Sequence, residues 1–362
     1  MSSNRTINLT KVDASLPRSS HSISVVNGNA YIYGGEINPR EPVDGDIHRI
    51  ELSSGRYERI AGSGDVPEPR VGHVAGVIEG KIYVFGGRGG PAMTPLDEQG
   101  AIHVFDPSTS QWTKLSPTPR STPNPSSYPC ARSYHCSTVT PDGRLIIHAG
   151  CGDASTGRLK DTWSFDPSTS EWSQLPDAPG DPRGGSSLAV GSDGRIWRFG
   201  GFNGKTEVGG SIEYLKGGVA DCRVGETPKW ESIIFGKSTS GLGRNGPNSA
   251  TALLSSTTGP GARSVTGLHV IDELVVVMGG EGKPSSTGGH DAAGNFWDDV
   301  WAFDSSDQRW DQLDLKVEGS KEGVMEPRGW FASDVVSESS IIVWGGINSK
   351  NERLSDGWIL RV

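Results

Sequence analysis

The residues with the clearest capacity for chemistry are arginines that recur along the chain in similar short contexts. Each begins a segment such as Arg-Ser-Tyr-His or Arg-Gly-Trp-Phe. The set is Arg18, Arg70, Arg132, Arg183, Arg263 and Arg328. A guanidinium stays charged and presents planar donors that can engage a carboxylate or sulfate through two hydrogen bonds. Each arginine therefore either binds an anionic ligand or pairs with an Asp or Glu of a neighbouring element.

A second group of residues could bind a metal ion. Glu281, His290 and Asp291 lie in one glycine-rich segment and are of the types that hold iron or other divalent metals. The alternative is that His290 and Asp291 belong to a solvated loop. The cofactor stays unassigned, with Fe(II) or another divalent metal as the candidate.

The usual catalytic motifs are missing from the sequence. Cys151 interrupts a paired-glycine pattern and is expected to face an opening, but no base can be assigned beside it. No Gly-x-Ser-x-Gly elbow on a strand-to-helix turn, no phosphate loop and no dinucleotide fingerprint between a strand and a helix is recognisable. His21, His73 and His135 each follow a recurring arginine by three residues, which favours a structural role. The catalytic residues therefore stay unknown.

Composition excludes several classes of partner. The 362 residues carry a formal net charge of -9, without the basic stripe that would neutralise phosphates. Nucleic acids and anionic membrane surfaces are therefore not expected as partners. The first residues contain no apolar core of signal-peptide length, and no run of about eighteen apolar residues occurs. We predict a cytoplasmic protein with reduced thiols at Cys130, Cys136, Cys151 and Cys222.

Recurring strands must position these side chains. An apolar strand that ends in paired glycines occurs six times, at 30–36, 81–88, 144–152, 195–202, 274–281 and 341–347. A second strand pair with a Trp follows most of them, as in DTWSFDPSTSEWSQL at 161–175. Its alternation places one apolar face against a neighbour, and its Asp-Pro-Ser stretch is turn chemistry. The repeats predict six antiparallel sheets.

The ends of the chain complete the last sheet. DGWILRV follows the sixth glycine strand without a Trp strand, and RTINLTKVD at 5–13 fits the vacancy. We predict an all-β, six-bladed propeller as a single domain over 1–362, with blade six shared between about 5–13 and 328–362. This closure removes open sheet edges and predicts intolerance to truncation at either end. The Gly/Ser-rich stretch 237–261 is predicted to be a long loop.

The glycine pair, the DVWAFD-type strand and the spaced Trp residues together resemble Kelch repeats over essentially the whole chain. Within them, 267–313 resembles plant specifier proteins, the nitrile- and thiocyanate-forming Kelch proteins. The shared part is a Gly-Gly-Glu, a Pro-Ser, a Gly-His element and an Ala-Gly before the Trp/Phe strand. The opening recurs as GGEINPREP at 34–42.

The resemblance implies a site at the central opening. In propellers of this kind the recurring arginines lie near the opening and can bind carboxylate or sulfate groups. Loops after the glycine strands would add Glu36, Arg88 and Asn203, and Trp330 would form an aromatic wall. Specifier proteins act on unstable glucosinolate aglucones, with ferrous iron held by a Glu, an Asp and a His spaced four residues apart. That spacing does not occur in this sequence, so the metal triad is not carried over.

Two function classes follow. The first is a small-molecule pocket protein resembling specifier proteins, as a non-redox lyase, isomerase or cyclase that acts on a reactive, anionic intermediate. Positioning alone can supply much of such a rate, so a missing triad does not exclude catalysis. The alternative is a protein-binding module that grips an acidic peptide at the mouth of the propeller. The first class predicts a deep pocket lined by arginine and aromatic groups.

Overall fold

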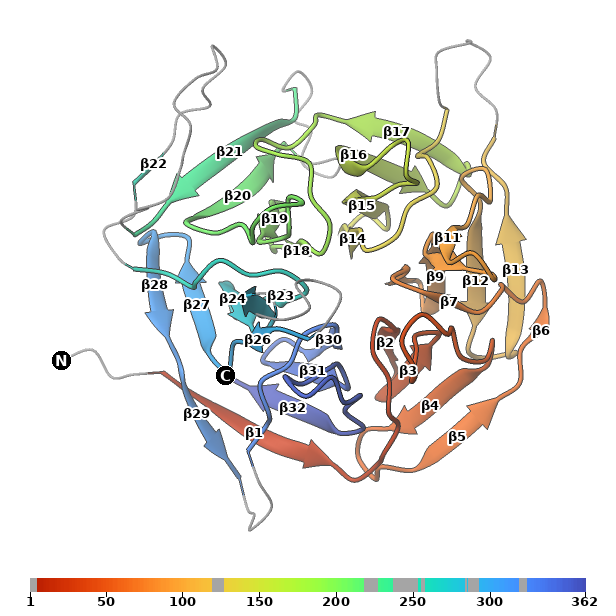
Figure 1. Ribbon diagram of the computed structural model, residues 1–362, viewed down its shortest axis with the longest axis horizontal. Coiled ribbons are helices and arrows are strands. Elements are labelled where there is room, and N and C mark those ends of the chain that lie inside the picture. Colours follow the sequence, from red (N-terminus) through yellow and green to blue (C-terminus); the bar gives the residue numbers. More distant parts are fainter. Residues whose placement is uncertain are drawn as a thin grey trace.

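The computed structural model describes residues 5–118, 127–217, 227–236, 253–254, 258–283, 285, 293–318 and 324–362. Six sheets of four or five strands are arranged radially around a central axis (Figure 1). No helix occurs in these ranges, and none is therefore long and apolar enough to cross a membrane. The prediction of an all-β, six-bladed propeller is confirmed.

Each blade runs from an inner strand at the axis to an outer strand at the rim. The inner strands are β2 (Ser22–Val26), β8 (Val74–Ile78), β14 (Cys136–Val139), β18 (Ser187–Val190), β23 (Gly267–Ile271) and β30 (Ala332–Ser337). The second strands are β3 (Asn29–Tyr33), β9 (Lys81–Phe85), β15 (Leu145–Cys151), β19 (Ile196–Phe199), β24 (Leu274–Met278) and β31 (Ser340–Trp344).

The two remaining positions complete each antiparallel blade. The third strands are β4 (Ile47–Glu51), β12 (Ile102–Asp106), β16 (Arg158–Asp166), β20 (Ser211–Lys216), β27 (Val300–Asp304) and β32 (Gly357–Arg361). The fourth strands are β5 (Tyr57–Ile60), β13 (Gln111–Leu115), β17 (Glu171–Leu175), β21 (Lys229–Ile234), β28 (Arg309–Gln312) and β1 (Thr6–Val12). Three blades carry a further parallel strand outside these, namely β6 (Ser63–Gly64), β22 (Leu253–Leu254) and β29 (Asp314–Val317).

Short strands above the blades form two small sheets. One contains β7 (Arg70–Val71), β10 (Arg88–Gly89) and β11 (Thr94–Pro95), and the other contains β25 (Glu281–Lys283) and β26 (Asn295–Phe296). β10, β11, β25 and β26 belong to the loops that follow glycine pairs, whereas β7 contains the recurring arginine that precedes the inner strand β8. Of the predicted long loop at 237–261, only 253–254 and 258–261 lie within the described residues.

The N-terminal strand closes the ring by completing blade six. β1 pairs antiparallel with β32, from Asn8 opposite Arg361 to Val12 opposite Gly357 (Figure 1). Its alternation buries Ile7 and Leu9, which are 0% and 1% exposed. The predicted sharing of one blade between the two ends of the chain is confirmed.

Apolar clusters fill the space between neighbouring blades, one at each of the six junctions. The Trp of a fourth strand packs on the aromatic residue that precedes the glycine pair of the preceding blade. Trp172 of blade three thus lies 5.0 Å from Phe85 of blade two, measured between ring centroids. The Trp strands that the sequence marks are therefore the contacts that join the blades.

The glycine pairs turn the chain at the top of each second strand. In blade one, Gly34 and Gly35 have φ angles of 61° and 86°. A Cβ added at Gly34 would lie 2.6 Å from the carbonyl oxygen of Arg70 and 2.7 Å from Cε1 of His73. Side chains are therefore excluded there by both space and backbone conformation.

Blade three has one residue other than glycine in its pair. The sequence analysis placed this exception at Cys151, but the structure places it at Ala149. Ala149 and Gly150 have φ angles of 59° and 99°, so they are the pair, and Cys151 follows it. The residue that interrupts the glycine pair is therefore Ala149. The position filled by His73 or His135 in the next blade is here Ser186, and the smaller side chain leaves room for the methyl group.

Candidate functional site

The recurring arginines are buried and most are paired with carboxylates of their own blades. In blade three, Arg132 donates two hydrogen bonds of 2.8 Å to the carboxylate oxygens of Asp161. Asp161 also accepts a hydrogen bond of 2.7 Å from Nε1 of Trp163. The same Arg-Asp-Trp arrangement occurs as Arg263-Asp299-Trp301 and Arg328-Asp356-Trp358.

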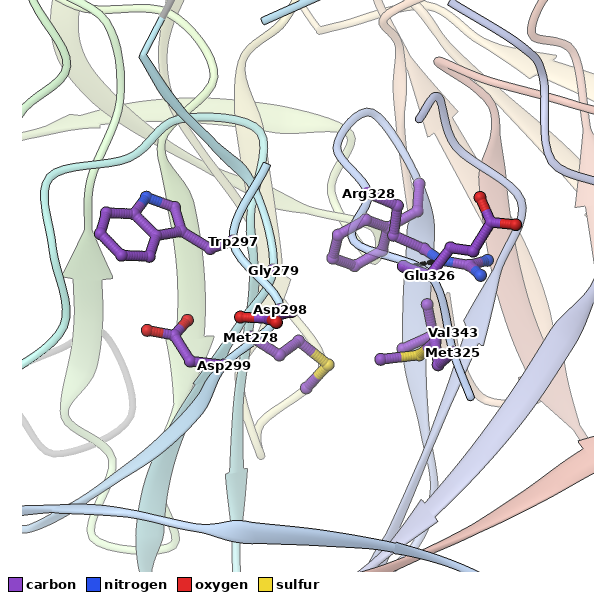
Figure 2. Close-up of a pocket in the computed structure, with 10 residues that line it drawn as sticks. Met278, Gly279, Trp297, Asp298, Asp299, Met325, Glu326, Arg328 and Val343 are labelled. Carbon is purple, nitrogen blue, oxygen red and sulfur yellow. Dashed lines mark hydrogen bonds between the residues drawn. The ribbon is translucent and has the colours of Figure 1, made fainter. Parts of the chain in front are cut away.

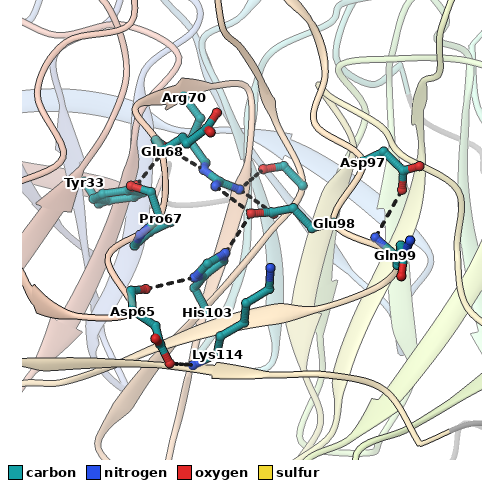
Figure 3. Close-up of polar contacts among 11 residues, drawn as sticks. Tyr33, Asp65, Pro67, Glu68, Arg70, Asp97, Glu98, Gln99, His103 and Lys114 are labelled. Carbon is teal, nitrogen blue, oxygen red and sulfur yellow. Dashed lines mark hydrogen bonds and ion pairs between the residues drawn. The ribbon is translucent and has the colours of Figure 1, made fainter.

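The remaining blades contain variants of this arrangement. In blade two, Arg70 donates to both oxygens of Glu98 at 2.8 and 3.0 Å, and Glu98 also contacts His103 (Figure 3). Burial opposes the charge of Glu98, but the hydrogen bonds from Arg70 and His103 lower its pKa to about 2. In blade one, Arg18 contacts His48 at 2.7 Å and Asp44 at 3.5 Å.

Blade four differs most. Arg183 donates hydrogen bonds of 3.2 Å to the carbonyl oxygens of Gly200 and Asp181, whereas Arg198 forms the buried ion pair with Glu213. Burial, followed by the charge of Arg198, lowers the pKa of Arg183 to about 10. Arg183 therefore holds the turn of its blade through carbonyl groups.

These positions correct the prediction that the recurring arginines bind a ligand at the opening. Among the described residues, none of the six lines the cavity at the mouth of the propeller. Five of them donate to the carbonyl oxygen of the first residue of a glycine pair, as Arg132 does to Ala149 at 3.2 Å. Their guanidinium groups donate to carbonyl and carboxylate oxygens inside the blades, because a buried charge requires hydrogen-bond partners.

Arg328 also borders a narrow cavity between blades five and six (Figure 2). Its volume is about 10 Å³, and Met278, Met325 and Val343 form its apolar side. A cavity of this size holds at most one water molecule. It is therefore too small for a substrate.

The main cavity, here called the mouth cavity, opens where the loops converge above the inner strands and has a volume of about 600 Å³. Every blade contributes to it the residue that follows its glycine pair. We call these the wall positions: Glu36, Arg88, Cys151, Phe202, Glu281 and Ile347. Each forms an antiparallel backbone bridge with the residue that follows the recurring arginine of its own blade. The repeat therefore directs one side chain per blade into the cavity.

The floor of the mouth cavity is a second ring, which we call the throat. It comprises the residues two positions after each recurring arginine: Ser20, Gly72, Tyr134, Gly185, Val265 and Trp330. All six have φ angles between 48° and 64°. Five backbone hydrogen bonds of 2.7 to 2.9 Å join them in order around the axis, each N–H donating to the carbonyl group of the preceding blade.

Below the throat lies a separate channel of about 360 Å³ that is lined by the six inner strands. It shares no lining residue with the mouth cavity within the described ranges. Its charged group is Asp334, which accepts hydrogen bonds from the backbone N–H groups of Val25 and Val335. Burial raises the pKa of Asp334 to about 6. The bond to Val25 joins blade six to blade one.

Four arginines line the mouth cavity, namely Arg40, Arg88, Arg158 and Arg353. Arg88 donates from Nε to the hydroxyl group of Ser133 at 3.0 Å, and its guanidinium lies 5.1 Å from the ring centre of Tyr134. Arg158 donates from Nε to the carbonyl oxygen of Phe202 at 3.0 Å and stacks over the Phe202 ring at 4.7 Å. Within the described part of the chain, no carboxylate lies within ion-pair distance of either. Their terminal nitrogens are positioned to hold an anion.

Glu36 and Arg353 form an ion pair within the wall. Glu36 accepts a hydrogen bond of 2.6 Å from Arg353 and another of 2.8 Å from the backbone N–H of Arg40. Glu36 was predicted to bind substrate, and it does line the cavity, but as one half of an ion pair. Its negative charge is therefore largely neutralised.

Glu281 and Glu207 form an acidic sector on the other side. Glu281 lines the cavity, and its Oε1 accepts a hydrogen bond of 3.0 Å from the backbone N–H of Gly294. Glu207 accepts a hydrogen bond of 3.0 Å from the hydroxyl group of Ser264. Burial, followed by the charge of Glu207, raises the pKa of Glu281 to about 7. Burial also raises the pKa of Glu207 to about 7, against the effects of Ser264 and Arg158.

The cysteine at the wall lies between the two arginines. Burial raises the pKa of the Cys151 thiol, while Arg158 and Arg88 oppose this shift. Cys130, Cys136 and Cys151 are free thiols, and Cys222 lies outside the described residues. Sequence reasoning expected Cys151 to face the opening, and it lines the mouth cavity.

A metal centre is not assembled by the residues that the structure describes. Glu281 is in place, whereas His290 and Asp291 lie outside the described ranges. Within those ranges, no group of three His, Cys, Asp or Glu side chains could hold a metal ion. The described donors do not fit the implied iron, and no chemical step is derived through a metal.

Two further predicted residues have different outcomes. Trp330 lines the mouth cavity and packs edge-on against Phe296 at 6.0 Å between ring centroids. Asn203 stabilises its own turn by accepting hydrogen bonds of 2.9 Å from the backbone N–H groups of Lys205 and Thr206. Phe202, not Asn203, holds the wall position in blade four.

Comparison with known proteins agrees with this architecture. A family model described as the KLHDC2/KLHL20/DRC7 Kelch-repeats domain matches residues 20–214. The chain belongs to this Kelch-repeat family. A solved structure titled "Structure of YjhT" matches with a TM-score of 0.66 and 17% identity over 96% of this chain and 95% of that one. This second likeness concerns the fold alone.

Among curated relatives, the Kelch protein is similar to an N-(sulfonatooxy)prop-2-enimidothioate sulfolyase from Thlaspi arvense. The two are 26% identical, over 96% of this chain and 93% of the relative. Kelch domain-containing protein 3 from Homo sapiens is 29% identical over 56% of this chain, which spans about half of that relative, 53% of its length. The resemblance to a plant specifier-type enzyme is thus confirmed over nearly the whole chain.

Proposed function

We propose that this Kelch propeller binds a small anionic organic molecule in the mouth cavity and promotes its elimination or rearrangement. The observation that carries the proposal is the pair Arg88 and Arg158, which line a cavity of about 600 Å³ without a carboxylate partner in the described part of the chain. Each guanidinium is held by an Nε hydrogen bond and an aromatic ring. Little side-chain freedom is therefore lost when a ligand binds.

The similarity to a sulfolyase supports a sulfate ester as the ligand. The name of that relative describes a substrate with a sulfonatooxy group, which a lyase removes. In such a reaction the N–O bond breaks and the sulfonatooxy group leaves with the bonding pair, as sulfate. In a rearrangement, the organic group on the neighbouring carbon migrates with its bonding pair to the nitrogen, and N=C=S forms. Arg88 and Arg158 would hold the sulfonatooxy group and stabilise the charge that develops on it. Tyr134, Phe202 and Trp330 would enclose the organic part.

The binding step can be tested by isothermal titration calorimetry with propyl sulfate and inorganic sulfate. We expect Arg88→Met and Arg158→Met each to weaken binding at least about tenfold, as loss of a charge-assisted hydrogen bond predicts. Arg309→Met is the control, because Arg309 pairs with Asp311 on the exposed β28. Wild-type affinity in the two cavity variants would contradict the proposal.

Catalysis requires a separate measurement. Release of sulfate from N-(sulfonatooxy)prop-2-enimidothioate is followed with and without protein, since this compound is named for the relative. Faster release with wild type than with Arg158→Met supports the lyase function. A fluorescent acidic peptide, titrated in parallel, tests the protein-binding alternative. If the peptide binds tightly and propyl sulfate neither binds nor displaces it, the result favours that alternative and overturns the proposed function.

A further inference from the structure

The channel below the throat has an apolar ring that the repeat builds from one residue per blade. In every blade, one residue of the inner strand pairs with the last residue before the glycine pair, as Ser22 does with Tyr33. The residue three positions further along the inner strand is a valine in all six blades: Val25, Val77, Val139, Val190, Val270 and Val335. All six line the channel, and none is fully buried. We call them the valine ring.

The layer one residue closer to the throat contains the polar groups of the channel. Its members are Ser24, Gly76, Thr138, Ala189, His269 and Asp334, and all of them line the channel. Gly76 has no side chain and Ala189 has only a methyl group, so side chains do not fill this layer. The volume of about 360 Å³ leaves room for a small ligand beside the polar groups.

Asp334 gives this layer a negative charge. Its Oδ2 accepts a hydrogen bond of 2.7 Å from Val25 and its Oδ1 one of 2.8 Å from Val335, and each oxygen can accept another. Among the described residues, no Lys or Arg lines the channel. His269 lies beside it with Nε2 2.8 Å from the hydroxyl group of Ser333, and burial lowers the pKa of His269 to about 4. At neutral pH the imidazole is therefore uncharged and does not neutralise Asp334.

The rim of the channel is also negative. The hairpins that join inner to second strands lie beyond the valine ring, and five of the six carry exposed carboxylates: Glu79, Asp142, Asp193, Asp272, Glu273 and Glu338. Arg144 pairs with Asp142, and Arg195 pairs with Asp193. In the part of the chain that the structure describes, the other four form no ion pair. A cation is therefore attracted to this face of the propeller.

We propose that the channel is a second binding site, which takes a primary ammonium group on an unbranched alkyl stem. The ammonium group donates to the free lone pairs of Asp334, and the stem lies in the valine ring between Asp334 and the rim. An ammonium group has three donors, and a carboxylate accepts only, so the two are complementary. Burial of the stem against the valines adds a hydrophobic contribution. This site shares no described lining residue with the mouth cavity and does not depend on the proposed function.

Matched probes isolate the ammonium group. Calorimetry at about pH 8 compares pentylammonium with 1-pentanol, because Asp334 and the amine are then both charged. We expect wild type to bind pentylammonium about tenfold more tightly than pentanol. Asp334→Asn should remove this preference, whereas the exposed Asp307→Asn should keep it. The comparison on wild type needs no variant to fold.

Methyl NMR of labelled valines locates the bound probe. Pentylammonium should shift the methyl signals of the valine ring and leave that of Val66, which is 39% exposed outside the channel, unchanged. Shifts confined to residues outside the ring would overturn the assignment. Equal affinity for pentylammonium and pentanol, or no binding of either, would also overturn it.

The same chemistry is found in a free alkylamine and in the lysine side chain of a protein partner. A tripeptide with a central lysine is therefore compared with the same tripeptide carrying norleucine, which lacks the amine. Binding of the lysine peptide with shifts in the valine ring supports the site and identifies a lysine side chain as a ligand. Binding of pentylammonium without binding of the lysine peptide supports the site and identifies a free amine.

Discussion

Arg132 donates two hydrogen bonds, each 2.8 Å long, to the carboxylate of Asp161 from a position that is 0% exposed. Removal of the arginine would leave a partly buried carboxylate without its cation. We expect Arg132→Met to lower the free energy of unfolding by about 3 kcal/mol. Urea denaturation measures this, with Arg309→Met on the surface as a control that changes it by less than about 1 kcal/mol. If Arg132→Met and Arg309→Met lowered the free energy of unfolding by the same small amount, the buried pair would not contribute to stability.

The exception at Ala149 can be tested by exchanging side chains between blades. We expect Ser186→His to destabilise the protein by about 1–3 kcal/mol, because the larger ring meets the Ala149 methyl group. Ala149→Gly should restore much of this loss, since Gly86 lies beside His135 in the same arrangement. A double-mutant cycle with the two single variants measures the coupling. Strictly additive effects would refute the steric explanation.

Closure by the N-terminal strand makes its buried face important for stability. Leu9 of β1 is 1% exposed and belongs to the cluster between blades five and six. Leu9→Ala should cost about 2–4 kcal/mol through lost burial and the remaining cavity. Thermal unfolding measures the stability of this variant. The control is Lys11→Ala, because Lys11 is exposed on the same strand, and its expected effect on stability is near zero. A loss for both variants alike would point to strand propensity rather than packing.

Asp334 predicts a specific dependence of stability on pH. Its pKa is raised to about 6 by burial, so the folded state binds the proton more tightly than the unfolded chain does. The stability contributed by this proton is present at low pH and is lost as the pH rises through about 6. We expect the stability advantage of wild type over Asp334→Asn to shrink by about 1–2 kcal/mol between about pH 4 and about pH 7.

The control for this pH series is Asp307→Asn, in the exposed turn before β28. Its difference from wild type should stay nearly constant over the same range. A difference between wild type and Asp334→Asn that widens with increasing pH would have the wrong sign. It would show that the hydrogen bonds from Val25 and Val335 outweigh burial at this carboxyl group.

The blade count and the closing strand could be predicted because both depend on local patterns. The glycine pairs require positive φ and close approach, as at Gly34, and the Trp strands carry contacts between blades, as at Trp172. DGWILRV is not followed by a Trp strand, and the N-terminal segment RTINLTKVD was predicted to take that place and does so. Such signals are contained within a few residues and need no knowledge of distant partners.

The site was predictable where it follows the repeat and not elsewhere. Glu36, Arg88 and Glu281 were assigned to the loops after the glycine strands, and they line the cavity because the repeat places the residue after each glycine pair at the same wall position. Arg132 was assigned to the opening, and its ion pair with Asp161 was not predicted. Asp161 is 29 residues away, and sequence spacing does not show which carboxylate a buried arginine contacts. Arg158 is the first residue of β16 and pairs with Cys151 at the end of β15, at a position that the sequence repeat does not mark.

The throat lies between the mouth cavity and the channel beneath it. Its backbone hydrogen bonds join the six blades at the axis, and the channel beneath shares no wall with the cavity above in the described chain. Under the proposed function, substrate and product would both use the opening of the mouth cavity. We therefore expect a reaction product to act as a competitive inhibitor, and turnover to depend on how quickly Arg88 and Arg158 let go of the departing anion.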